Sequence, residues 1–153
     1  MSISHTSVSV SPGSTILLKR TSSIPAKSAS LPRLITQLVE AFSGRTGIVP
    51  QLTLEGERAL PQAVKVALYR IAQETLNNIS KHARATQVNV YLTMNPVVKL
   101  TIEDNGRGFV PEQTNSGSLG LKIMHERADM IDARLMIQSE PGKQTTLTVE
   151  WKH

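Results

Sequence analysis

The chain has 153 residues, of which 39% are hydrophobic, and it has no cysteine; this indicates one ordinary folded domain and excludes a disulfide framework or a thiolate zinc site. The formal net charge is +5, but the first 39 residues supply +4 of it through Lys19, Arg20, Lys27 and Arg33 and hold no acid, so the remainder is almost neutral. Because nucleic-acid modules combine a basic face with aromatic stacking residues, and this chain has only 2 Phe, 2 Tyr and 1 Trp, the composition argues against nucleic-acid binding.

Residues 1–30 have the composition of a tail or linker. They contain 13 Ser or Thr residues and no acidic residue, which is typical of a segment that cannot bury a core. We therefore expect residues 1–30 to be disordered and the folded domain to span residues 31–153. No run approaches the roughly 18 consecutive apolar residues of a membrane helix, so we expect a cytoplasmic domain without direct membrane contact.

The first half of the folded region predicts two helices and one strand. Apolar residues recur at helical spacing and stop at Gly44, which predicts a helix over residues 32–43. Residues 51–54 are expected to form a short strand. A long helix is predicted from Pro61, which suits the first helical position, to about Ala83.

The second half predicts a hairpin, a polar loop, a helix and a closing strand pair. Strands are expected over 88–94 and 98–104, joined by a turn at Asn95 and Pro96, and a loop over 105–118 follows them. The next element is a helix with Leu121, Met124, Ala128 and Ile131 on one face. The last two strands, over 135–137 and 147–151, flank a turn at Pro141 and Gly142. Hairpin-linked strands with helices between them predict an α+β fold, a two-layer sandwich with helices on one face of a mixed sheet.

The end of the long helix is the first candidate site. Its inward apolar stripe turns polar, because Asn78, Lys81 and His82 are predicted to continue the side begun by the buried residues, and Glu74 lies one turn before Asn78. Unpaired polar groups are costly to bury, so such a stripe usually faces a ligand or an ion. Equally, the helix could simply extend into water beyond the sheet.

Two further segments are candidates. Asp104 continues the inward face of its strand, and an inward carboxylate needs a hydrogen-bond donor; an Asp-Asn-Gly hairpin turn is the alternative. Residues 116–120 are small and precede the predicted helix, where backbone amides and the helix dipole favour an anion. The sequence has no Walker lysine motif, dinucleotide-binding glycine motif or eukaryotic protein-kinase signature.

Together these three segments resemble the N, G1 and G2 boxes of bacterial histidine-kinase ATP-binding domains, in order and spacing. They are residues 74–83 (ETLNNISKHA), 104–109 (DNGRGF) and 119–128 (LGLKIMHERA). The resemblance covers about residues 31–151 and is strongest to the short-lid branch of nitrate/nitrite and lipid-desaturase sensors. It implies the Bergerat fold of the GHKL superfamily, which binds ATP.

The resemblance also implies roles for individual residues. Asn78 would hold Mg²⁺ against the phosphates and is assigned as catalytic together with Glu74, which would polarise the attacking group or a metal-bound water. Asp104 would accept a hydrogen bond from the adenine amino group. The other implied nucleotide contacts are Lys81 and His82 near the phosphates, Gly106 and Gly108 close to the base, Leu119, Gly120 and Leu121 at the lid hinge, and Thr145 beside the adenine.

Three departures from the family pattern matter. Ser118 stands where a glycine is common, and Lys143 and Gln144 replace the glycines that usually precede the threonine. The phosphate acceptor of these kinases is a histidine in a separate helical domain, and His125 lies within the predicted third helix and is a poor candidate for it. We therefore expect a monomeric catalytic domain that phosphorylates a histidine-bearing dimerisation domain and acts on a response regulator only indirectly.

Two other functions stay open from the sequence. One is an anti-sigma-type serine kinase of the same superfamily. The other is a nucleotide-sensing module without turnover, suggested by the missing acceptor. For each of these functions, the cytoplasmic domain could be free or could be the cytoplasmic end of a membrane-bound sensor.

Overall fold

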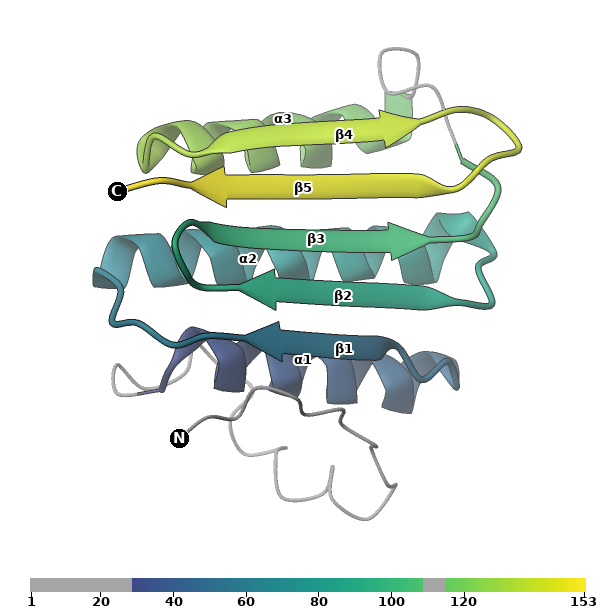
Figure 1. The fold of residues 1–153 in the computed structure, drawn as a ribbon. Helices are drawn as coiled ribbons and strands as arrows, with labels where there is room; N and C mark the ends of the chain where they lie inside the picture. Colours follow the sequence, from purple (N-terminus) through teal and green to yellow (C-terminus); the bar gives the residue numbers. More distant parts are fainter. Residues whose placement is uncertain (1–28, 109–114) are drawn as a thin grey trace.

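A computed structural model describes residues 29–108 and 115–153 (Figure 1). The predicted tail over residues 1–30 therefore lies almost entirely outside the described part. The elements are α1 Leu31–Thr46, β1 Gln51–Glu55, α2 Gln62–Asn78, a π-helix η2 Ile79–Ala83, β2 Val88–Thr93, β3 Val98–Asp104, α3 Asn115–Met130, β4 Arg134–Ser139 and β5 Thr145–Trp151.

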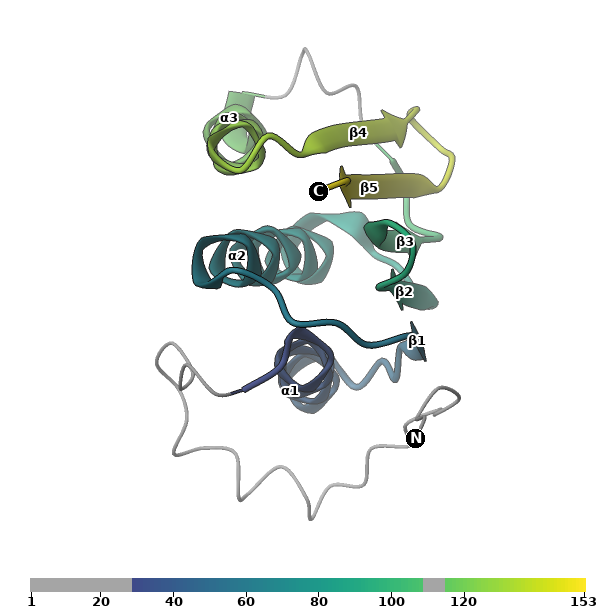
Figure 2. The ribbon, with the colours of Figure 1, turned by 60° about the vertical axis from the view of Figure 1, so that its left-hand side comes forward.

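The strands form one five-stranded sheet in the order β1-β2-β3-β5-β4. The β1–β2 pair is parallel and the other three pairs are antiparallel. Helices α1, α2 and α3 lie side by side on one face of this sheet (Figures 1 and 2). This arrangement confirms the predicted two-layer α+β sandwich with a mixed sheet.

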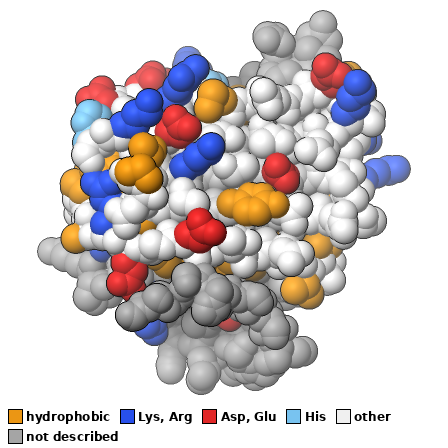
Figure 3. Space-filling view, viewed as in Figure 1, with side chains coloured by type: hydrophobic (Ala, Val, Ile, Leu, Met, Phe, Trp, Pro, Cys, Tyr) orange, Lys and Arg blue, Asp and Glu red, His pale blue; other side chains and the backbone are white. Residues whose placement is uncertain are grey.

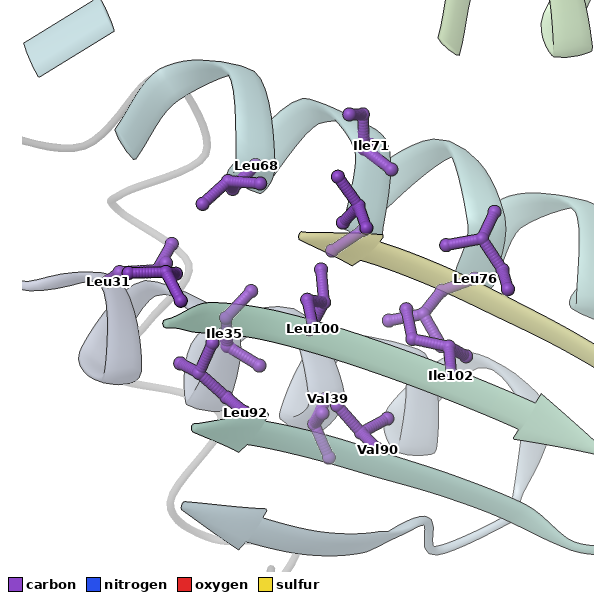
Figure 4. Close-up of a cluster of buried hydrophobic side chains, with 14 of the residues drawn as sticks. Leu31, Ile35, Val39, Leu68, Ile71, Leu76, Val90, Leu92, Leu100 and Ile102 are labelled. Carbon is purple, nitrogen blue, oxygen red and sulfur yellow. The ribbon is translucent and has the colours of Figure 1, made fainter. Parts of the chain in front are cut away.

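The core lies between the helix layer and the sheet (Figure 4). Alternate residues of β2, β3 and β5 point into it, as period-two burial in these strands shows. Leu68 and Ile71 of α2 are fully buried over the central strands, and so is Phe42 of α1. Full burial of a large apolar side chain contributes about 1.5–3 kcal/mol, so these stripes hold the helices against the sheet.

The opposite face of the sheet carries mainly uncharged polar side chains (Figure 3). Thr53, Tyr91, Thr101 and Thr148 are neighbours in one row across four strands, and Tyr91 is 37% exposed. The helix layer therefore covers one face only. None of the helices in the described part is long and apolar enough to cross a membrane.

The ends of the first two helices differ from the prediction. Helix α1 continues past Gly44 to Thr46, because Gly47 adopts the left-handed conformation (φ 80°) and its N–H bonds the carbonyl of Ser43. The glycine at 44 only lowers helix propensity, whereas the glycine at 47 closes the helix. Pro61 is the residue before α2 rather than its first helical residue.

Helix α3 also begins elsewhere than predicted. It starts at Asn115, so residues 116–120, expected as a loop before the helix, lie within its first turns. Its apolar stripe is as predicted, because Met124 and Ala128 are buried, and Leu121 and Ile131 pack against the core. The helix N-terminus that was expected next to Gly120 is therefore five residues earlier in the chain.

Candidate nucleotide-binding site

The residues expected to bind nucleotide come from segments that meet at one end of the sheet. The C-terminal end of α2, the C-terminal end of β3, the start of α3 and the β4–β5 turn lie on the same side of the molecule, at the right in Figure 1. Helices α2 and α3 also pack against each other. Segments that are distant in sequence thus form one candidate site.

Asp104 lies at the end of β3 with its side chain on the core face. It is 5% exposed and is paired in register with Val88 on one side and Thr145 on the other. Among the described residues its carboxylate has one donor, the N–H of Gly106, at 2.8 Å from Oδ1. Burial raises the pKa of Asp104 above its ordinary value, and the Gly106 hydrogen bond opposes this in part. The inward direction predicted for Asp104 is confirmed.

Thr145 lies directly across from Asp104 and shares its inward face. The pairing Asp104↔Thr145 joins β3 to β5, and the pairing Ser139↔Thr145 joins β5 to β4. The hydroxyl groups of Ser139 and Thr145 are hydrogen-bonded at 2.7 Å. A carboxylate and two hydroxyls therefore stand in one row across the end of three strands. The sequence prediction did not include Ser139.

Glu74 and Asn78 occupy one edge of α2, one turn apart. Both side chains are partly buried. In the described part of the chain neither makes a side-chain hydrogen bond, whereas the neighbouring Asn77 accepts one from Arg45 at 3.3 Å. No fully buried polar side-chain atom of the described residues lacks a partner, so the polar atoms of Glu74 and Asn78, which have no partner there, are not fully buried.

The helix that carries Asn78 changes geometry immediately after it. Residues Ile79–Ala83 form a π-helix, which ends at Arg84 in the left-handed conformation (φ 55°). A wider turn rotates the following side chains away from the positions of a regular α-helix, and such turns are frequent at functional sites. Lys81 is exposed, and its predicted place near the phosphates stays a prediction. The side chain of His82 lies outside the described part.

Gly120 of α3 lies against the side chain of Glu74. A Cβ at position 120 would stand 2.7 Å from Glu74 Oε2, so glycine at this position leaves space for the carboxylate. Leu121 is partly buried and packs on the core, while the side chain of Leu119 is not among those described. The structure therefore brings Gly120 to the N-box edge of α2, and the predicted lid-hinge role of residues 119–121 stays a prediction.

Gly108 lies against the β4–β5 turn. It has φ 70°, and a Cβ there would overlap the carbonyl oxygens of Glu140 and Lys143. The N–H of Gly142 in the same turn donates a hydrogen bond to the carbonyl of Arg107. The backbone of the turn thus already explains the need for glycine at 108, and the predicted approach of Gly106 and Gly108 to a base stays a prediction.

Substitution Gly108→Ala is expected to lower the free energy of unfolding by about 2 kcal/mol or more, because it adds a left-handed alanine and a collision with the turn backbone. Gly142→Ala is the matched control: Gly142 also has a positive φ (82°), but nothing lies within 4 Å of its Cβ position. Urea denaturation of both variants measures the difference. Equal losses would show that the contact with the turn is not what requires glycine at 108.

Oxygen donors suited to Mg²⁺ are present at the candidate site. No group of three or more His, Cys, Asp or Glu side chains among the described residues could hold a metal ion. Mg²⁺ keeps several waters and usually takes one or two protein oxygens plus substrate phosphates. The amide oxygen of Asn78 and the carboxylate of Glu74 are oxygen donors of this kind on one helix edge.

Comparison with known proteins finds relatives that are named as histidine kinases. The chain is 36% identical over 118 residues to the signal transduction histidine-protein kinase/phosphatase DegS of Brevibacillus brevis, covering 75% of this chain and 30% of that protein. It is 33% identical over 117 residues to the sensor histidine kinase LiaS of Bacillus subtilis, covering 76% and 32%. The chain therefore spans about a third of the length of these relatives.

Solved structures show the same fold. The histidine kinase AdeS of Acinetobacter baumannii superposes with a TM-score of 0.67 at 14% identity, over 92% of this chain and 74% of that chain. The histidine kinase domain of a blue-light activated kinase from Erythrobacter litoralis superposes with a TM-score of 0.65 at 18% identity, over 88% and 67%. The family model described as histidine kinase-, DNA gyrase B- and HSP90-like ATPase matches residues 63–153, and the chain belongs to this family of ATPases.

Proposed function

We propose that this domain binds Mg²⁺-ATP and transfers the γ-phosphoryl group to a histidine on a separate dimerisation domain. The observation that carries the proposal is Asp104, a buried inward carboxylate with one protein donor among the described residues, at the sheet end where α2 presents Glu74 and Asn78. The family match to ATPases and the relatives named as sensor histidine kinases support it.

In this proposal the Asp104 side of the site recognises the adenine base of ATP, and the Asn78 side recognises its phosphates. Asp104 accepts a hydrogen bond from the adenine amino group, and Thr145 lies beside the base. Asn78 holds Mg²⁺, which would neutralise phosphate charge when bound. The remaining contacts stay as predicted from the family: Lys81 and His82 near the phosphates, Gly106 and Gly108 near the base, and Leu119, Gly120 and Leu121 at the lid hinge.

The transfer step needs positioning more than covalent chemistry from the protein. A ring nitrogen of the partner histidine attacks the γ-phosphorus, a nitrogen–phosphorus bond forms, and the bond from that phosphorus to the ADP oxygen breaks. Glu74 accepts a hydrogen bond from the attacking imidazole and orients it. Glycine at position 120 leaves space for this carboxylate, because a Cβ there would stand 2.7 Å from Oε2.

The partners follow from this role. They are the histidine-bearing dimerisation domain and, indirectly, a response regulator, with no nucleic acid and no direct membrane contact. We propose a cytoplasmic, monomeric ATP-binding domain, free or as the cytoplasmic end of a membrane-bound sensor.

We expect one Mg²⁺-ATP or Mg²⁺-ADP to bind per chain, because the candidate residues all lie at one end of the sheet. Isothermal calorimetry on the wild-type chain should give a stoichiometry near one. The absence of both binding heat and a thermal shift at about millimolar nucleotide would contradict the proposal.

Labelled ATP mixed with this domain and an excised histidine-bearing domain tests the transfer. Label that is acid-labile on the partner marks a phosphohistidine and supports the proposal. Acid-stable label on a serine would favour the anti-sigma-type kinase, and binding without any transfer would favour the nucleotide-sensing module.

A further inference from the structure

The side chain of Asn105 joins two segments of the candidate site. Its Oδ1 accepts hydrogen bonds from the backbone N–H groups of Thr86 at 2.8 Å and Gln87 at 2.9 Å. Its Nδ2 donates to Thr86 Oγ1 at 3.0 Å. The backbone N–H of Asn105 also donates to the carbonyl of Gln87 at 3.2 Å. One residue therefore makes four hydrogen bonds to two consecutive residues.

These bonds link the end of β3 to the segment between the π-helix and β2. Asn105 directly follows Asp104, the proposed adenine residue. Thr86 and Gln87 follow the π-helix that extends α2 beyond Asn78. The β2–β3 pairing ends at Val88↔Asp104, so the Asn105 side chain continues the connection one step past the last paired residues, where the chain has left the regular sheet.

We propose that Asn105 is a positioning residue for nucleotide binding, which fixes the segment after the Asn78-bearing helix relative to Asp104; this rests on the proposed function. Among the described hydrogen bonds, the Asn105 side chain makes none to Asn78 or to the Asp104 side chain. It therefore acts by placing the backbone. Asn105 is exposed, so its three side-chain hydrogen bonds hold the local placement of this segment and are not part of the buried core. Its loss therefore affects geometry more than folding.

The expected effect on binding follows from the fraction of molecules in which the two segments are correctly placed. If loss of the side chain leaves about one molecule in ten with the two segments correctly placed, the apparent affinity for nucleotide falls about tenfold. Asn105→Ala should show this fall by calorimetry with Mg²⁺-ATP, while its melting temperature stays close to that of wild type. In the protein without nucleotide, amide hydrogen exchange at Thr86 and Gln87 should become faster.

Two further variants separate positioning from a general effect. Asn105→Asp keeps Oδ1 as the acceptor for both amides, so its affinity should stay within about threefold of wild type and its exchange should stay slow. Asn95→Ala is the matched control, because Asn95 is also exposed and its Nδ2 donates to the carbonyl of Glu57 at 3.1 Å, but it lies in the turn between β2 and β3 at the other end of the sheet. Its affinity should be that of wild type.

The outcomes distinguish the two proposals. Wild-type protein that binds no nucleotide would overturn the proposed function itself. Wild-type binding with an unchanged affinity of Asn105→Ala would overturn only the role of Asn105, even if exchange at Thr86 and Gln87 becomes faster. An equal loss of affinity in Asn105→Asp and Asn105→Ala would also overturn it, because the acceptor oxygen would then not be the group that matters.

Discussion

Replacing Asn78 by alanine is expected to abolish the Mg²⁺-dependent part of nucleotide binding and to lower phosphoryl transfer to the partner histidine by about 100- to 1,000-fold. The reason is that Asn78 is the proposed oxygen ligand to a cation that has few protein ligands, and loss of one preorganised electrostatic group costs about this much in rate. Calorimetry with and without Mg²⁺, together with transfer of label, measures both effects.

Asn77→Ala is the matched control for this variant. Asn77 is the adjacent residue of α2, and its side chain bonds Arg45 of α1 rather than facing the site. It should keep its Mg²⁺ dependence and transfer rate, and any effect should be confined to thermal stability. If Asn78→Ala instead lowers the melting temperature and leaves Mg²⁺ dependence intact, Asn78 is a structural residue at the end of its helix.

The fold was predictable because the strands and helices here bury one face each. The alternation of Val98, Leu100 and Ile102 fixes which side of β3 is inward, and the structure buries all three. The turn at Asn95 and Pro96 joins β2 to β3 as predicted. These local patterns depend only on side chains within one element, which is why they specify the order and type of the elements.

The helix ends were less predictable because they depend on backbone conformation. A glycine at 44 and a glycine at 47 look alike in sequence, but only Gly47 adopts the left-handed conformation that ends α1. The π-helix over Ile79–Ala83 has no sequence pattern of its own, so the regular helix predicted to continue to about Ala83 ends at Asn78 instead. The early start of α3 likewise places Gly120 inside a helix.

The site was predictable where one residue's direction follows from its own strand. Asp104 is such a residue, and its burial bears out the inward direction. Contacts between distant segments were not predictable in this way. The sequence places Asn105 in the G1-box segment and in a possible turn, but it does not reveal the partners Thr86 and Gln87, which precede it by 19 and 18 residues. Ser139 was missed because only the register of β4 on β5 places it beside Thr145.

Replacing Asp104 by asparagine is expected to weaken ATP binding about ten- to a hundredfold. The carboxylate would lose a charge-assisted hydrogen bond from the adenine amino group, worth roughly 1.5–3 kcal/mol, and the new amide presents a donor to a donor. GTP should lose less, because guanine offers a carbonyl at that position. Competition of ATP and GTP against a fluorescent nucleotide, on wild type and variant, measures the two ratios.

The same substitution should stabilise the protein without nucleotide at neutral pH. Burial raises the pKa of Asp104 in the folded state above its ordinary value of 3.8, so the folded state binds the proton more tightly than the unfolded state does. Stability of the wild type therefore falls as pH rises through the interval between these two pKa values. Asparagine has no charge to bury, and its oxygen can still accept from Gly106, so the stability advantage of the variant should be present at pH 7 and shrink as pH falls toward about 4.

These two effects of Asp104→Asn have opposite signs, and that combination separates a binding residue from a turn residue. A carboxylate kept for a ligand costs stability when the ligand is absent, so the variant should melt at a higher temperature and bind ATP less tightly. A carboxylate kept to hold the Asp-Asn-Gly turn through Gly106 would give a lower melting temperature and an equal loss for ATP and GTP. Melting curves from pH 4 to pH 7, set beside the two nucleotide affinities, decide which description of Asp104 is correct.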